Sequence, residues 1–285
     1  MRDFSDILLT VDFDRTLTAP DSTIPERNIE AIRYFMENGG TFTVNTGRSV
    51  PMSAKALIGV VPVNAPLLLY NGSAAYDAET GILTRYDPIG LDGAQFVSDL
   101  QNRFPELNVE IQALDAHYLI RKNTEWEKYC ENCGCAWGYV TPETIPQPFI
   151  KVSYYGEFRK DTVADMYEAT PEELALFDRA IKYVEKTYGD KIEVFRACAR
   201  IVDLHAKGVS KLLSARKLQQ ALGKKLLICV GDAENDITML DGADYAYCPA
   251  DGIVADRYEN VCRCGDGAVA DVIYKKIPQI LQKQP

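Results

Sequence analysis

The sequence predicts an α/β fold in which an inserted α+β domain interrupts a parallel sheet flanked by helices. Three features support this prediction. Strand-like and helix-like segments alternate over residues 1–76, mixed hairpin and helix signals follow over 77–200, and the alternation resumes after residue 200. Successive strand–helix–strand units imply parallel strands joined by right-handed crossovers, as in a Rossmann-like sheet.

The first part of the chain contains three predicted strands separated by helices. The apolar run at 7–13 and the segments 41–48 and 66–72 are typical of buried strands, and each ends in polar residues or glycine. Between the first two strands, apolar residues recur at helical spacing over 26–38, and two glycines then end the helix. A further helix is expected from Ser49.

The inserted part begins with a hairpin at 73–87, which a continuing strand–helix repeat would not need. Beyond it we expect helices at 92–103 and 171–188, the second capped by Thr170, and strands at 108–113, 117–122, 149–156, 191–197 and 200–206. The alternation resumes with a helix at 208–223, a strand at 225–232 and a helix at 233–243. The expected division is a discontinuous core domain of residues 1–76 and 201–285 and an inserted domain of residues 77–200.

Composition narrows the possible functions and locations. The net charge of −10 argues against a general affinity for nucleic acid or anionic lipid, and no apolar span is long enough for a transmembrane helix. The amino terminus lacks the basic start of a secretory signal, so we predict a cytoplasmic protein. The spacing of Cys130, Cys133 and Cys135 fits no standard zinc pattern, which favours thiols in a reducing cytoplasm.

Four aspartates follow two of the predicted parallel strands. Asp12 and Asp14 end the first strand, and Asp232 and Asp236 follow the strand at 225–232. Because ligands of open parallel sheets bind at the carboxyl ends of the strands, these side chains are expected to converge. Four crowded carboxylates would raise one another's pKa values, and a divalent cation removes that cost. Ligation by oxygen alone points to Mg²⁺.

Phosphate is the anion that such a site would accept. Thr46 offers a hydroxyl, and the backbone N–H groups of the following turn lie at a predicted helix start. Lys211, which opens the helix after the insertion, supplies a point charge, and Lys207 is the alternative cation. No Ser-His-Asp pattern or catalytic cysteine setting is apparent, so the predicted mechanism is a carboxylate nucleophile that forms an aspartyl-phosphate.

The segments DFDRTLT, TGR, KGVSK and GDAEND stand in an order and spacing that resembles the haloacid dehalogenase (HAD) superfamily. That family's pattern is DxDxT, a strand-terminal Ser or Thr, a Lys and then GDxxND. With the insertion between the second and third motifs, the chain resembles the Cof-type branch, which carries an α/β type-II cap. The resemblance implies that residues 77–200 form this cap and read the leaving group of the substrate.

The resemblance also implies a role for each matching residue. Asp12 would be the nucleophile, and Asp14 would protonate the leaving group and then activate water. Thr46 would bind the phosphoryl oxygens, and Lys211 would neutralise the nucleophile and the phosphate. Asp232 would ligate Mg²⁺ together with Asp12 and the backbone carbonyl of Asp14.

The remaining motif residues have less direct roles. Asp236 would lie in the outer shell of the metal site, and Asn235 would orient the phosphate or the lysine. Gly47 and Arg48 would extend the phosphate-binding turn. Many relatives carry glycine at position 15, where this chain has Arg15; solvent exposure and contact with a second anionic group of the substrate both remain open for this side chain.

Three classes of function fit these residues. The first is a Mg²⁺-dependent phosphatase for a small phosphorylated metabolite, plausibly a sugar phosphate. The second is a phosphosugar mutase or phosphotransferase, similar to the phosphomannomutases, which would have to pass the phosphoryl group to a second hydroxyl. The third is a non-catalytic phosphometabolite-binding protein, which the intact set of side chains disfavours. The identity of the substrate and the oligomeric state do not follow from the sequence.

Overall fold

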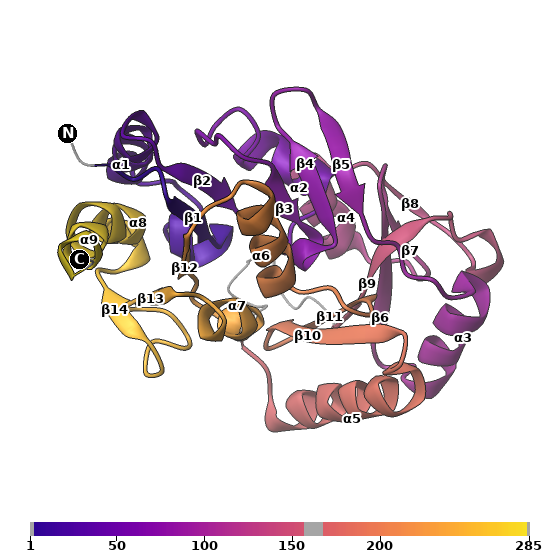
Figure 1. The fold of residues 1–285 in the computed structure, drawn as a ribbon. Coiled ribbons are helices and arrows are strands. Elements are labelled where there is room, and N and C mark those ends of the chain that lie inside the picture. Colours follow the sequence, from indigo (N-terminus) through magenta and orange to yellow (C-terminus); the bar gives the residue numbers. More distant parts are fainter. Residues whose placement is uncertain (1–2, 157–167, 284–285) are drawn as a thin grey trace. The chain divides into compact units, whose positions relative to one another are not determined.

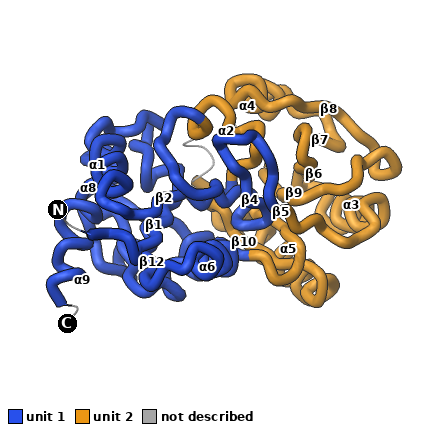
Figure 2. The backbone as a smooth tube through the Cα atoms, turned by 45° about the horizontal axis from the view of Figure 1, so that its top comes forward, with its two compact units in different colours: residues 1–47, 59–84, 210–285 blue, residues 48–58, 85–209 orange. Residues whose placement is uncertain are grey.

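The computed structural model describes residues 3–156 and 168–283 (Figure 1). The chain divides into two compact units: unit 1 contains residues 1–47, 59–84 and 210–285, and unit 2 contains residues 48–58 and 85–209 (Figure 2). No helix in the described ranges is long and apolar enough to cross a membrane.

Unit 1 is built on a five-stranded parallel sheet, as the strand–helix alternation predicts. Its strands follow the order β14 (Glu259–Val261), β13 (Tyr245–Pro249), β12 (Leu226–Val230), β1 (Ile7–Val11) and β2 (Thr41–Val44). Every residue of β1 is buried, because β1 has strands on both edges and helices over both faces. This buried interior strand leads directly to Asp12.

Helices cover the two faces of this sheet. One face packs on α6 (Lys211–Ala221) and α7 (Ile237–Asp241), through a cluster that includes Leu8, Ala215 and Met239. On the other side, α1 (Glu26–Glu37) packs against α8 (Ala268–Asp271), and α9 (Ile277–Lys283) follows (Figure 1). The helical spacing of α1 is confirmed, since its apolar stripe is buried.

A small second sheet extends unit 1 and contains the predicted hairpin. It consists of β3 (Leu67–Leu69), β4 (Ala74–Asp77) and β5 (Ile82–Tyr86), and β3 adjoins the main sheet through a parallel bridge between Asn45 and Leu68. The predicted strand 66–72 ends early. The three residues after β3, Tyr70 to Gly72, all have positive φ, which forces the chain to turn back into β4.

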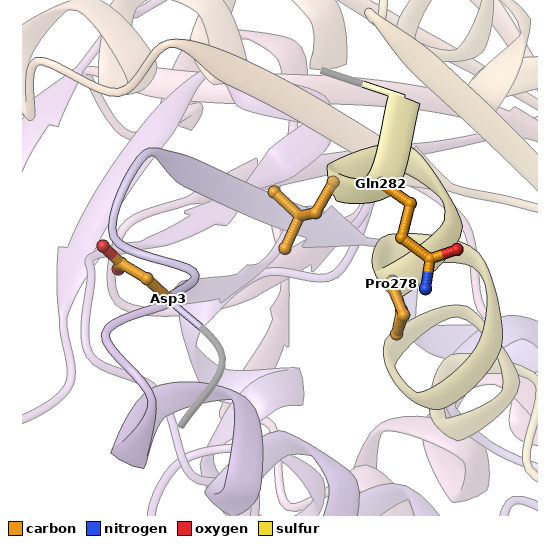
Figure 3. Close-up of a pocket in the computed structure, with 4 residues that line it drawn as sticks. Asp3, Pro278 and Gln282 are labelled. Carbon is orange, nitrogen blue, oxygen red and sulfur yellow. The ribbon is translucent and has the colours of Figure 1, made fainter. Parts of the chain in front are cut away.

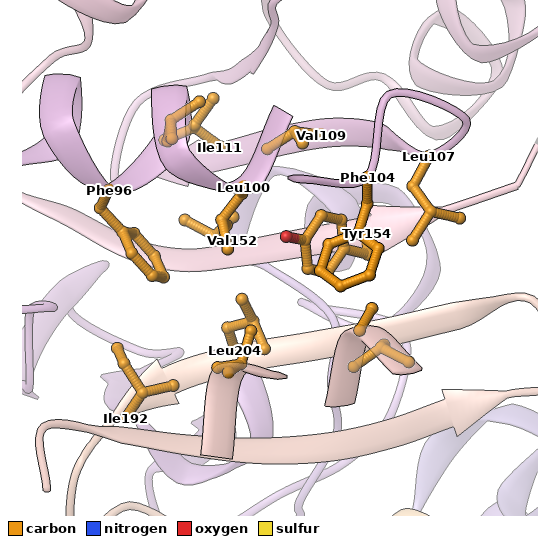
Figure 4. Packing of buried hydrophobic residues seen from close by; sticks show 14 of the residues in the cluster. Phe96, Leu100, Phe104, Leu107, Val109, Ile111, Val152, Tyr154, Ile192 and Leu204 are labelled. Carbon is orange, nitrogen blue, oxygen red and sulfur yellow. The ribbon is translucent and has the colours of Figure 1, made fainter. Parts of the chain in front are cut away.

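Unit 2 contains a six-stranded sheet that is antiparallel apart from one pair. The strand order is β10 (Ile192–Cys198), β11 (Ile201–Ala206), β9 (Phe149–Tyr155), β6 (Asn108–Ala113), β7 (His117–Leu119) and β8 (Trp137–Tyr139), and β7 and β8 are parallel. Residues on one face, such as Ile111, Val152 and Leu204, form a core with α3 (Gly93–Arg103) and α5 (Pro171–Tyr188) (Figure 4). The intervening residues, including Glu110 and Gln112, point to the opposite face.

A smaller apolar cluster in unit 2 joins α2 (Val50–Ala56) to α4 (Thr124–Cys133). It buries Trp126, Cys130, Cys135 and Tyr155, with Met52 packed against them. The sequence analysis predicted neither α4 nor β8. No disulfide joins the cysteines in the described ranges.

Two sequence-based expectations need correction. The expected core segment starts at residue 201, whereas β11 is hydrogen-bonded between β9 and β10 in the sheet of unit 2. The helix expected at 233–243 is a 3-10 turn at Glu234–Asp236 followed by the short α7. The predicted cap of Thr170 on α5 is confirmed, because its side chain accepts a hydrogen bond from Glu173 N.

Candidate active site

Asp12 and Asp232 leave the parallel sheet of unit 1 at the same edge. Val11 pairs with Val230 in neighbouring parallel strands, and Asp12 N donates to Val230 O at 2.9 Å. Gly231 then turns the chain; a Cβ atom there would lie 2.6 Å from the Cβ of Asp236. The close approach of the loop therefore requires glycine between β12 and Asp232.

Lys211 lies among these carboxylates as the first residue of α6. Its ammonium group is 2.7 Å from Asp12 Oδ1 and 2.6 Å from Asp236 Oδ1, and the side chain is 1% exposed. Ser210 caps the helix, and Asn45 Nδ2 donates to Lys211 O at 2.8 Å. The backbone of Lys211 is therefore fixed by the helix cap before it and by the hydrogen bond to its own carbonyl. Lys207, the alternative cation, is exposed and pairs with Glu193 in unit 2.

Asp236 holds the loop through both of its carboxylate oxygens. Its Oδ2 accepts hydrogen bonds from the N–H groups of Asp232 and Ala233 at 3.0 and 3.2 Å, while its Oδ1 contacts Lys211. Both of its oxygens are therefore occupied, which agrees with the outer-shell role implied for it.

Asp12 and Asp232 are the carboxylates that could bind a cation directly. Ligand atoms of Asp12, Asp232 and Asp236 lie within 4.8 Å of one another. In the described part of the chain, the hydrogen bonds from side chains to Asp12 and Asp232 involve their Oδ1 atoms; Thr16 Oγ1 donates to Asp232 Oδ1 at 3.0 Å. The Oδ2 atoms remain for a metal ion, so the donor set fits a hard divalent cation.

Burial makes this site electrostatically costly without a cation. It raises the pKa of Asp12 to about 7, an effect that Lys211 opposes and that Asp236 and Asp14 increase. Burial, followed by the charges of Asp12 and Asp236, also raises the pKa of Asp232 well above its usual range. Burial alone would lower the pKa of Lys211, but the two carboxylates beside it raise the value. A bound cation would favour the charged forms of Asp12 and Asp232.

The turn of residues 46–48, here called the TGR turn, leaves the sheet beside Asp12. Asn45 N donates to Val11 O at 2.8 Å, and Thr46 N donates to Leu68 O at 2.9 Å. Thr46 is buried, and its carbonyl accepts a hydrogen bond from Asn71 N at 2.9 Å. A Cβ at Gly47 would lie 2.9 Å from Asn71 Oδ1, so the turn packs closely on Asn71.

Asn71 connects the TGR turn to the GDAEND loop. Its Oδ1 accepts a hydrogen bond from Asn235 Nδ2 at 3.4 Å, and its backbone adopts φ 53°. The sequence places Asn71 at the end of a predicted strand, at the sheet edge expected to carry the site, but an Asn-Gly pair alone is a common turn signal. A left-handed Asn-Gly pair after a buried strand, at the same sheet edge as the aspartates, is the signal that could have identified it.

Asp14 and Arg15 lie in the turn after Asp12. Asp14 is half-buried, and its charge raises the pKa of Asp12. Arg15 has φ 58°, a conformation that glycine adopts without strain, and its N–H donates to Thr18 Oγ1. This backbone conformation is one that a glycine at position 15 would favour.

Arg48 belongs to unit 2, because the boundary between the units falls after Gly47. Its Nη1 donates to Met52 O at 3.4 Å in α2. Within unit 1, the structure brings together Asp12, Lys211, Asp232 and Asp236, and it links Thr46, Gly47 and Asn235 through Asn71. A phosphate-binding role for Arg48 stays a prediction.

A separate surface pocket of about 340 Å³ is lined by residues of α9 and the segment before β1. The lining residues are Asp3, Pro278, Leu281 and Gln282 (Figure 3). None of them belongs to the predicted site.

A model of the haloacid dehalogenase-like hydrolase family matches residues 9–255. The chain belongs to this family. The match confirms the resemblance carried by the four motifs and establishes the chain as a HAD-type hydrolase, with a parallel α/β core and an additional antiparallel sheet.

Relatives of this HAD chain are phosphatases by name. YxeH of Bacillus subtilis (strain 168), with a provisional phosphatase name, is 24% identical over 252 residues, which are 86% of this chain and 88% of YxeH. The 5-amino-6-(5-phospho-D-ribitylamino)uracil phosphatase YitU of the same organism is 22% identical over 87% of this chain and 88% of its own. The solved HAD subclass IIB sugar phosphatase BT4131 shares the fold, with a TM-score of 0.73 and 16% identity over 96% of this chain and 98% of that one.

Proposed function

We propose that this HAD hydrolase is a Mg²⁺-dependent phosphatase that hydrolyses a small phosphorylated metabolite through an aspartyl-phosphate intermediate. The observation that carries the proposal is the contact of one buried ammonium group, that of Lys211, with both Asp12 and Asp236 beside Asp232. A carboxylate that must attack phosphorus needs positive charge nearby to stay ionised and to accept a second anion.

The chain's own residues account for each step. The Asp12 carboxylate attacks phosphorus, and the P–O bond to the leaving group breaks while Asp14 donates a proton to that oxygen. Asp14 then takes a proton from water, whose oxygen attacks the aspartyl-phosphate and releases inorganic phosphate and the free Asp12 carboxylate. Thr46 and the backbone of the TGR turn bind phosphoryl oxygens, and Lys211 stabilises their charge.

Mg²⁺ would be held by Asp12, Asp232 and the backbone carbonyl of Asp14, with Asp236 fixing the loop around it. When bound, it would supply charge neutralisation and orientation of the phosphoryl group. The names of YitU and BT4131 favour a sugar phosphate or a phosphorylated polyol as the substrate class. The negative net charge still favours a small-molecule partner over nucleic acid, and the cytoplasmic location stays a prediction.

The test is hydrolysis of p-nitrophenyl phosphate by the wild type, Asp12→Asn and Asp14→Asn, with Mg²⁺ and with EDTA. We expect activity only for the wild type with Mg²⁺, and a fall in kcat of about 10⁴-fold or more for Asp12→Asn, as for the loss of other nucleophiles. Asp256→Asn removes the same charge from an exposed position and is expected to match the wild type.

Two outcomes would contradict the proposal. Wild-type activity in Asp12→Asn would remove the nucleophile assignment. Isomerised product from a sugar monophosphate in the presence of a bisphosphorylated sugar, without release of inorganic phosphate, would identify a mutase instead. A panel of sugar phosphates, polyol phosphates and nucleotides then defines the leaving group.

A further inference from the structure

Three buried polar side chains of unit 2 form a chain of contacts that begins directly after the TGR turn. Ser49 Oγ lies 2.7 Å from His117 Nε2, and His117 Nδ1 lies 2.7 Å from Glu110 Oε1. Ser49 is fully buried, His117 is 1% exposed and Glu110 is 8% exposed. These residues come from the start of α2, from β7 and from β6, which are distant in sequence.

Ser49 can accept one hydrogen bond and donate another at the same time. Ser49 is the N-cap of α2, and its Oγ accepts the N–H of Met52 at 3.2 Å. The hydroxyl proton of Ser49 can then be donated to His117 Nε2. His117 Nδ1 lies within ion-pair distance of the Glu110 carboxylate without forming a hydrogen bond. Ser49 Oγ is therefore held by two hydrogen bonds, and the Glu110 carboxylate lies behind the ring of His117.

The same three residue types occur in serine hydrolases, but the surroundings of Ser49 exclude that chemistry. Its Oγ is fully buried and is already used as the cap of α2. A nucleophilic hydroxyl must reach a substrate atom, and no substrate reaches a fully buried one. Ser49, His117 and Glu110 therefore have a structural role.

Ser49 is fixed through its backbone as well. Its carbonyl accepts hydrogen bonds from Ser53 N at 3.0 Å and Ser53 Oγ at 2.8 Å. The residues immediately before it are those of the TGR turn, whose other end is held by Leu68 and Asn71 in unit 1. The conformation of the turn is therefore defined at one end by Ser49.

We propose that His117 and Glu110 are positioning residues for phosphate binding. By holding Ser49 in its capping conformation, they fix the backbone of Arg48 and the end of the TGR turn. The inference rests on the proposed function, because it takes the TGR turn as the phosphate-binding element. Neither residue needs to touch the substrate, and their contribution is to binding rather than to the chemical step.

The experiment compares His117→Leu and Ser49→Ala with Ser49→Thr, which keeps the hydroxyl. We measure the inhibition constant of inorganic phosphate, kcat for p-nitrophenyl phosphate, and amide hydrogen exchange over residues 45–57. The first two variants should raise the inhibition constant about tenfold, equivalent to about 1.4 kcal/mol, with kcat changed less than the inhibition constant. Ser49→Thr should restore both the inhibition constant and slow exchange.

Asp92→Ala is the matched control, because Asp92 caps α3 in the same unit through a hydrogen bond from Gln95 N. It removes an equivalent helix cap without contacting the chain of Ser49, so the inhibition constant should stay at the wild-type value. An inhibition constant that rises equally in Asp92→Ala would show a general loss of stability and overturn the positioning role.

Hydrogen exchange separates this inference from the proposed function. If the wild type neither hydrolyses nor binds phosphate esters, the proposed function fails, yet residues 45–57 should still exchange faster in His117→Leu. Exchange and phosphate inhibition at wild-type values in a folded His117→Leu or Ser49→Ala would overturn the inference while leaving the phosphatase assignment intact.

Discussion

Lys211 shows how one buried cation organises a group of carboxylates. It contacts Asp12 and Asp236, and Asp236 in turn holds the backbone of the loop that carries Asp232. Removing one partner of such a group leaves an uncompensated buried charge, at a cost of about 3–5 kcal/mol. The same contact therefore supports both the fold of the loop and the ionised form of Asp12.

Thr16 has a narrower role, because its hydroxyl donates to Asp232 Oδ1. Thr16→Val keeps the shape of the side chain but leaves this oxygen without its donor. We expect the affinity for Mg²⁺ to fall about 10–100-fold, as for other hydrogen bonds to metal ligands, with kcat recovered at saturating Mg²⁺. Activity measured as a function of Mg²⁺ concentration tests this.

Thr10→Val is the control for that variant. Thr10 is buried in β1, and its Oγ1 has no hydrogen-bond partner among the described residues. Its replacement should leave the Mg²⁺ dependence unchanged and cost little stability. Equal Mg²⁺ dependence in the two variants would show that the hydroxyl of Thr16 does not orient the metal ligand.

The sequence predicted part of this site and missed the rest for physical reasons. The placement of Asp12, Lys211 and Asp236 at one sheet edge was predictable, since strand ends and helix starts can be read from apolar patterns. The contact of Asn45 with the carbonyl of Lys211 was not, because it joins residues 166 positions apart and depends on tertiary packing. For Asn71 the sequence offered only a turn signal, and its contact with Asn235 likewise depends on packing.

At the scale of elements, the turn after β3 determines how closely α6 can approach. Gly72 has φ +92°, and a Cβ there would lie 2.5 Å from both Ser210 O and Ser214 Oγ. Ser210 is the cap of α6, and the next residue is Lys211. The placement of Lys211 thus depends on a glycine that lies far from it in sequence.

Gly72→Ala should destabilise unit 1 by more than the strain of its φ alone. Gly59→Ala is the matched control, since Gly59 also has a positive φ (+76°) but a Cβ there would have no atom within 4 Å among the described residues. We expect Gly72→Ala to cost about 1–3 kcal/mol more than Gly59→Ala, the usual range for overpacking. Urea unfolding measures the difference, and equal costs would contradict the close approach.

Two helices differ from the expectation, for different reasons. In α4, the residues that face the apolar cluster include Trp126 and Cys130, and one apolar pair at helical spacing is too short a pattern to indicate a helix. The helix expected at 233–243 is short because the side chain of Asp236 binds the N–H groups of Asp232 and Ala233, which holds the loop out of a helix. In this loop, hydrogen bonds from the backbone to the side chain of Asp236 outweigh the helix propensity of the segment.

At the scale of the whole molecule, buried titratable groups determine how stability changes at low pH. His205 is fully buried in β11, and burial lowers its pKa to about 3, an effect that Asp203 opposes and Lys151 increases. Asp203 itself lies 3.3 Å from the Lys151 ammonium. The sheet of unit 2 therefore carries a neutral histidine beside an ion pair.

This histidine predicts a loss of stability at low pH. Between pH 6.5 and about 3 the unfolded chain binds a proton at His205 that the folded chain does not, so stability falls as pH falls. The slope from this one group is up to about 1.4 kcal/mol per pH unit. His205→Gln lacks this titrating group, so the wild type should lose stability relative to the variant below pH 6.5. The free energy of unfolding of both proteins, measured as a function of pH, tests this.

A constant difference between the two proteins from pH 7 to pH 4 would contradict this prediction. His117→Gln is not a suitable control, since His117 belongs to the chain of Ser49. Comparing the wild type with His205→Gln removes the contribution of the site aspartates to the pH dependence, because these aspartates are the same in both proteins.

The pairing of β1 with β12 has a consequence for protein synthesis. Ile7 lies opposite Leu226 and Val11 opposite Val230, so β1 gains β12 as a neighbour only after residues 12–225 have been made. At usual elongation rates, about 10–40 seconds separate the two strands on the ribosome. Unit 2, apart from residues 48–58, is one continuous stretch and can fold during that time. Asp12 is thus synthesised well before Lys211 and Asp236, whose side chains it lies beside in the folded protein.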